Sequence, residues 1–169
     1  MGDIFKEQLV NRKRTLKDGM ISALIVIGAI LVVLAVSIFI PQVLLVAVMI
    51  VAYGAYWLIQ RQDIEYEYIL TNGDLDIDEI MNKSKRKRVL SVSVKNFVAM
   101  AHVEDTEHAH ELNNFEKTLD YSSGEIKPNT YAALFNHNNQ KVKMIFEPNE
   151  EIIKGIFHYI PRKLYIKRR

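Results

Sequence analysis

The sequence contains no cysteine among its 169 residues. This absence excludes disulfide bridges, cysteine nucleophiles and thiolate metal sites. A large charge of one sign is also absent, because 22 Lys and Arg stand against 20 Asp and Glu, for a formal net charge of +2. Proteins that bind nucleic acid through bulk charge need a larger positive excess, so we expect no nucleic-acid partner.

Charge is missing altogether between Asp18 and Arg61. This stretch is about twice as long as the roughly 20 residues of one transmembrane helix. Pro41 lies at its midpoint and ends a helix, because proline lacks an N–H group and restricts the residue before it. We therefore predict two transmembrane helices, at about 20–40 and 42–60. A single kinked helix would carry half of its apolar length into water, and the stretch is too long for the core of a signal peptide.

The flanks of this predicted hairpin suggest its orientation. Basic residues precede the first helix and Arg61 follows the second, whereas the turn at Pro41 and Gln42 carries no charge. The positive-inside rule then places both termini in the cytoplasm. The basic residues of the first flank are Lys6, Arg12, Lys13, Arg14 and Lys17.

Three aromatic residues, Tyr53, Tyr56 and Trp57, lie near the end of the second predicted helix. Their amphipathic rings favour the membrane interface, although packing against the first helix would explain them as well. The predicted spans contain no Asp, Glu, Lys, Arg or His. Since ion paths and proton relays need such residues, we expect no transport by this chain alone.

The N-terminal segment 1–19 has two interpretations. In helical spacing, Ile4, Phe5 and Leu9 lie roughly on one side, which predicts a short amphipathic helix at anionic headgroups. The alternative is a cytoplasmic polar flank that serves only to orient the hairpin.

The remainder, residues 61–169, changes to the period of two that is typical of strands. Ile64, Tyr66, Tyr68 and Leu70 alternate with Glu65, Glu67 and Ile69, and the turn Thr71–Asp74 follows, in which Asn and Gly accept positive φ. We predict seven strands, at 64–70, 75–79, 86–94, 97–103, 115–121, 130–136 and 141–146.

The end of the chain reads as one helix. Asn149 is a candidate cap, Glu150 and Glu151 suit the first turn, and Pro161 stops the helix. The residues expected on its buried stripe are Ile152, Ile153, Ile156, Phe157 and Ile160. Strands followed by an amphipathic helix predict an α+β domain in which an antiparallel sheet curls and the helix covers its open face.

The run Tyr68–Ile77, the basic Lys83–Arg88 and Leu90–Val92 resemble the opening of bacterial pleckstrin-homology (PH)-like domains. The whole chain, including Phe5–Gln8 and Phe146–Pro148, resembles an uncharacterised family of small bacterial two-pass membrane proteins. The resemblance implies a PH-like curled sheet or barrel with a C-terminal helix, in the cytoplasm beside a bacterial cell membrane. It implies no activity.

Two charged segments are candidate sites. The cations Lys83, Lys85, Arg86, Lys87 and Arg88 could contact anionic lipid headgroups, or could be a solvated strand end that protects a sheet edge. The region of His102, His108 and His110 contains several carboxylates, but a polar loop fixes no ligand geometry, so we expect a solvated loop and no metal.

No nucleophile elbow, phosphate loop or metalloprotease motif occurs in the sequence. We therefore expect no enzyme, no cofactor and no small-molecule substrate. The sequence favours a membrane-anchored cytoplasmic binding or scaffolding module that recognises a protein partner or forms a homo-oligomer. The alternatives are an accessory subunit of a membrane transport or secretion complex, and a module that binds anionic lipid through residues 83–88.

Overall fold

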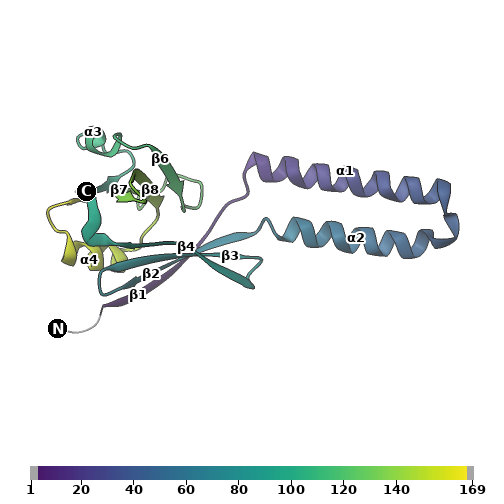
Figure 1. Cartoon of the computed structure of the whole chain (residues 1–169), viewed down its shortest axis with the longest axis horizontal. Coiled ribbons are helices and arrows are strands. Elements are labelled where there is room, and N and C mark those ends of the chain that lie inside the picture. Colours follow the sequence, from purple (N-terminus) through teal and green to yellow (C-terminus); the bar gives the residue numbers. More distant parts are fainter. Residues whose placement is uncertain (1–3, 167–169) are drawn as a thin grey trace. The chain divides into compact units, whose positions relative to one another are not determined.

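The computed structural model describes residues 4–166, which form two compact units (Figure 1). The helical unit comprises Arg14–Ile64 and the short segment Met81–Lys85. The sheet unit comprises the described residues of Met1–Lys13, Glu65–Ile80 and Arg86–Arg169.

The helical unit is an antiparallel pair of apolar helices, α1 (Leu16–Phe39) and α2 (Leu44–Gln60), joined by the 3₁₀ turn η1 (Pro41–Val43). Thr15 begins α1 with a capping box, because its side chain accepts from the Asp18 N–H and the Asp18 carboxylate accepts from the Thr15 N–H. Both helices are long and apolar enough to cross a membrane, as the uncharged stretch predicts.

The two helices contact each other along one stripe each. In α1, the half-buried positions recur every three or four residues, including Ser22, Ala29 and Val36. In α2 they include Ala47 and Gly54. The remaining apolar side chains of both helices are largely exposed.

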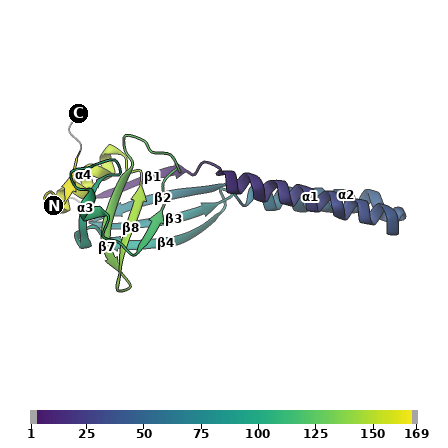
Figure 2. The ribbon, with the colours of Figure 1, turned by 90° about the horizontal axis from the view of Figure 1, so that it is seen from above.

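The first sheet has the strand order β1–β2–β3–β4. Figure 2 shows these strands lying side by side. Their bounds are β1 (Phe5–Asn11), β2 (Ile64–Thr71), β3 (Asp74–Met81) and β4 (Lys85–Ser93).

Residues 5–11 form strand β1, so of the two interpretations of the N-terminal segment the amphipathic helix is wrong. Strand β1 pairs antiparallel with β2 from Phe5↔Thr71 to Asn11↔Glu65, so the domain that was expected at 61–169 also contains residues before the helices. A short isolated helix is marginal in water, whereas the edge of β2 offers unpaired backbone groups to a strand. Val10 of β1 is buried as a result.

The second sheet has the order β6–β8–β7–β5–β9. Its strands are β5 (Phe97–His102), β6 (Lys117–Asp120), β7 (Tyr131–His137), β8 (Gln140–Phe146) and β9 (Leu164–Tyr165), with η2 (Val94–Asn96) before β5 and the short helix α3 (Ala109–Leu112) before β6. All seven predicted strands are present, but residues 4–166 form nine strands, because β1 and β9 are added. The sheet is also not wholly antiparallel, since β6 pairs parallel with β8 and β9 parallel with β5.

Helix α4 (Glu150–Tyr159) begins at Asn149, whose side chain accepts from the Ile152 N–H. It packs closely on β2, because a Cβ at Gly155 would lie 2.5 Å from Leu70 Cδ2. The buried stripe therefore centres on Gly155 and Ile156. The prediction that Phe157 is buried is wrong: its side chain is 44% exposed, since it lies about 200° around the helix from Gly155.

Candidate functional site

The sheet unit has an open groove of about 940 Å³ beside α4. One wall is α4, with Glu150, Ile153 and Lys154. The other side is formed by residues that are distant in sequence, namely His102, Glu104, Ile126, Lys127, Pro128, Asn129, Tyr131 and Ile166.

Apolar side chains are unusually open to solvent at this groove. Ile126 is 66% exposed and Ile166 47% exposed. Phe157 lies four residues after Ile153 and therefore on the same side of α4, which extends the apolar surface. Exposed apolar side chains that gather at a groove are typical of surfaces that bind another molecule.

A buried carboxylate fixes the loop that carries Ile126. Glu147 is almost fully buried and accepts hydrogen bonds from the Ser123 N–H, from the Ser123 hydroxyl and from Lys127 Nζ at 2.8 Å. Burial by itself opposes ionisation, but these hydrogen bonds and the Lys127 charge outweigh it and lower the pKa of Glu147. The loop at 123–127 is therefore held in place, and the groove is a preformed feature of the sheet unit.

The three histidines do not come together as a ligand set. His102 is buried, and its Nδ1 accepts from the Glu104 N–H while Nε2 lies 3.0 Å from the Lys127 carbonyl oxygen. His108 stacks on Tyr165 and bonds Asp105, whose pKa this hydrogen bond lowers. Among residues 4–166, no group of three or more His, Asp or Glu side chains is placed to hold a metal ion.

The basic segment divides into two parts. Arg86 Nη2 lies 2.6 Å from the carboxylate of Glu67, and Arg88 forms ion pairs with Asp76 and Asp78 at 2.7 and 2.8 Å. Burial, followed by the neighbouring Glu7, raises the pKa of Glu67, and Arg86 opposes that rise. The charges of these two arginines are therefore paired with carboxylates of the first sheet.

Among residues 4–166, the lysines of the segment are not paired with carboxylates. Within the described part of the chain, the side chains of Lys83, Lys85 and Lys87 form no hydrogen bond or ion pair, and all three residues are exposed. Lys83 and Lys85 belong to the helical unit, whereas Lys87 belongs to the sheet unit. The sequence reasoning treated five cations as equivalent, and only these three remain available to an anionic ligand.

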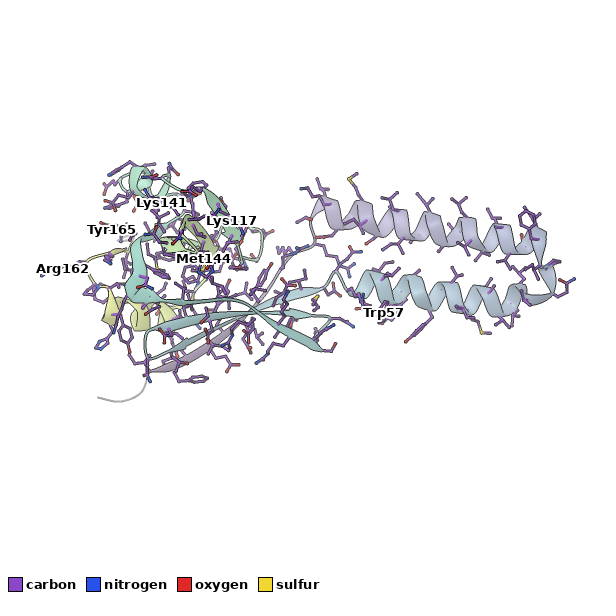
Figure 3. The ribbon with its side chains drawn as sticks, in the orientation of Figure 1. Trp57, Lys117, Lys141, Met144, Arg162 and Tyr165 are labelled. Atoms are coloured by element: carbon purple, nitrogen blue, oxygen red, sulfur yellow. The ribbon has the colours of Figure 1, made fainter. Side chains whose placement is uncertain are left out.

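The aromatic residues of α2 are exposed, with exposed fractions of 71% for Tyr53, 61% for Tyr56 and 45% for Trp57. Figure 3 shows Trp57 close to the C-terminal end of α2. The Arg61 guanidinium lies 3.6 Å from the centroid of the Trp57 ring, a cation–π contact between two residues that both suit a membrane interface. The assignment of Tyr53, Tyr56 and Trp57 as interface anchors stays a prediction.

Residues 2–166 match the sequence profile of a family described as "Bacterial PH-like domain (DUF6106)". No protein of curated function and no solved structure matches the chain.

Proposed function

Because the chain belongs to the bacterial PH-like domain family DUF6106, we propose that it is a membrane-anchored binding module whose sheet unit captures a protein partner at the inner face of a bacterial membrane. The observation that carries this proposal is the groove beside α4, with the exposed Ile126 and Ile166 at its surface. Burying two such side chains against a partner removes apolar surface from water, which is the main favourable term in protein association.

The surface of the helical unit supports membrane anchoring. Its apolar side chains are exposed along both helices, and a hydrocarbon environment makes such a surface favourable. The cations of the helical unit lie near the helix ends opposite the η1 turn. Three of them, Arg14, Lys17 and Arg61, flank those ends in sequence. The other two, Lys83 and Lys85, are brought near by the hydrogen bond from the Asn82 N–H to the Asp63 carbonyl oxygen.

Strand pairing supports the placement of both helix ends on one side of the membrane. Strand β1 precedes α1, β2 follows α2, and the two strands pair along their lengths. The positive-inside rule identifies that side as the cytoplasm. A cysteine introduced at Gln42 should react with an impermeant maleimide in intact cells, whereas one at Lys117 in the sheet unit should not. Labelling at position 117 would reverse the orientation.

The test of partner binding is photocrosslinking in native membranes. A photoreactive amino acid at Ile126 of the full chain should yield a discrete protein product, and a probe at the exposed Lys141, outside the groove, should not. A second substitution, Ile166→Asp, should abolish the product without unfolding the protein, because Ile166 is at the surface. Equal products at 126 and 141 would contradict the proposal.

The same experiment examines the two alternatives that involve protein contacts. A product of twice the chain mass would identify the partner as a second copy. If the product disappears when α1 and α2 are replaced by an unrelated helical hairpin, the helices make the principal contact, as expected of an accessory subunit in a membrane complex.

A further inference from the structure

The turn between β3 and β4 has an unusual backbone. Asn82 and Lys83 both have positive φ, at 49° and 52°, and the Ser84 N–H donates to the Met81 carbonyl oxygen at 3.2 Å. Positive φ at both central residues is the geometry of a type I′ turn, which favours Asn followed by Gly. For Lys the left-handed conformation is unfavourable, because Cβ crowds the following carbonyl oxygen.

The turn between β2 and β3 provides an internal comparison. It uses the same backbone with Asn72 and Gly73, at φ values of 51° and 93°. Apart from Lys83, the described non-glycine residues with positive φ are all asparagines, at 72, 82, 138 and 139. Lys83 therefore occupies a position where Gly or Asn would be more stable, and strained residues of this kind mark functional positions.

The position of the turn suggests what that function is. The Asn82 N–H donates to the carbonyl oxygen of Asp63 at 2.8 Å, and Asp63 lies three residues after the end of α2. Lys83 therefore lies beside the end of an apolar helix, where the phosphate groups of lipids would be found.

The charge around Lys83 is not neutralised. The Asp63 carboxylate is occupied by Arg14, which bonds the same oxygen through Nε at 3.0 Å and Nη2 at 2.8 Å. The helical unit contains five Lys and Arg against two carboxylates, Asp18 and Asp63, and Asp18 is buried in the capping box of α1. The side chains of Lys83 and Lys85 are exposed, and among the described residues neither forms an ion pair.

We propose that Lys83 and Lys85 form a contact site for the phosphate group of an anionic phospholipid, and that the strained Lys83 is retained for this contact. The proposal takes membrane insertion of α1 and α2 from the proposed function, but it does not depend on the protein partner. It assigns no lipid contact to Arg86 and Arg88, whose charges are paired within the first sheet.

Trp57 provides the measurement, because it is the single tryptophan of the chain and lies near the same end of α2. The full chain is reconstituted into vesicles of phosphatidylcholine and phosphatidylglycerol, and one lipid or the other carries brominated chains that quench Trp57. The ratio of Trp57 quenching by brominated phosphatidylglycerol to Trp57 quenching by brominated phosphatidylcholine gives the preference for the anionic lipid. Lys83→Asn keeps a residue suited to positive φ but removes the charge, and should lower the preference about fivefold, the effect of about 1 kcal/mol per cation at an anionic surface.

Four controls make the result specific. Lys83→Arg should retain the preference, and Lys117→Gln, which removes a cation from the sheet unit, should not change it. Lys83→Gly should lower the lipid preference while raising the denaturation midpoint, a combination that a purely structural role does not produce. Inorganic phosphate at constant ionic strength should leave the preference unchanged.

Several results would overturn the proposal. One is a wild-type chain without preference for phosphatidylglycerol, and another is an unchanged preference in Lys83→Asn. A lower midpoint in Lys83→Gly would show that Lys83 is kept for structure. Displacement by inorganic phosphate would reassign the site to a soluble anion. Failure of partner crosslinking at Ile126 would not change any of these four lipid and stability measurements. The lipid proposal and the partner proposal can therefore be rejected independently of each other.

Discussion

In the sheet unit, large apolar side chains such as Tyr68, Phe97 and Phe146 are fully buried, whereas in the helical unit Leu24 and Leu45 are mostly exposed. The first arrangement is stable in water because it removes apolar area from solvent. The second arrangement has no comparable core, since two helices can bury only one stripe each. The difference fits the proposed insertion of the helical unit into a membrane, and it predicts that the sheet unit is stable without the helices.

The largest expected effect comes from removing the helices. Because β1 and β2 pair up to Asn11↔Glu65, a short Gly–Ser linker in place of residues 14–63 should join them without strain. This linked protein should move from the membrane fraction to the soluble fraction and fold cooperatively, as judged by denaturant unfolding.

A shorter fragment serves as the control. Residues 61–169 alone lack β1, so they expose the edge of β2 and lose the contacts of Val10. This fragment should aggregate or unfold at a lower denaturant concentration than the linked protein. A linked protein that stays in the membrane fraction would show that the sheet unit itself holds the membrane.

A pair of substitutions on α4 sharpens the comparison within the sheet unit. Ile156 is fully buried, so Ile156→Ala should lower the free energy of unfolding by about 2–5 kcal/mol. Its neighbour Phe157 is 44% exposed, and Phe157→Ala should cost about 1 kcal/mol or less. Denaturant titration of the linked protein measures both. Equal losses would mean that the helix has a different rotation on the sheet.

The smallest effect concerns Glu147 and depends on pH. Its folded pKa is lowered, so its contribution to stability is present above the ordinary Glu pKa of about 4.3 and is lost as the pH falls through the lower folded value. At neutral pH, Glu147→Gln should reduce the free energy of unfolding by about 1.5–3 kcal/mol, the range for hydrogen bonds to charged groups. Below the folded pKa, wild type and variant should converge.

Glu67 provides a matched control for that experiment. It is also almost fully buried, but its folded pKa is raised, so ionisation of Glu67 reduces stability as the pH rises through the folded value. Glu67→Gln should therefore keep the acid-side loss of stability that Glu147→Gln removes. If both variants flatten the acid side equally, the assignment to Glu147 is incorrect.

Local patterns were enough to predict most of the fold. The uncharged stretch with Pro41 predicted α1 and α2, and the period of two predicted β2 to β8. Strand β1 was missed because its partner lies beyond both helices, and no local pattern reports such a distant pairing. Strand β9 has two residues, which is too short for any periodicity to appear.

The site was less accessible from the sequence. The groove gathers residues from β5, β7, α4 and the loop at 126–129, and no motif joins them. One part of the charge pairing in the basic segment could be predicted from the sequence. Asp76 and Asp78 are two residues apart and so share one strand face, and Arg88 lies on the neighbouring strand, a pattern that predicts ion pairs across a hairpin. The pairing of Arg86 with Glu67 of β2 has no such local signal.

The interruption of the first sheet by α1 and α2 has a consequence for biosynthesis. Strand β1 leaves the ribosome before either helix, and its partner β2 is made only after both. Strand β1 therefore has no β2 to pair with while the helices are synthesised. A loop that contains both helices has to close before the first sheet is complete. Closure requires β1 and β2 to meet in one compartment. If α1 and α2 cross a bilayer as proposed, a chain with only one of them inserted would keep these strands apart and leave the β2 edge open to proteases and chaperones, so completion of the first sheet would distinguish correctly inserted chains from misinserted ones.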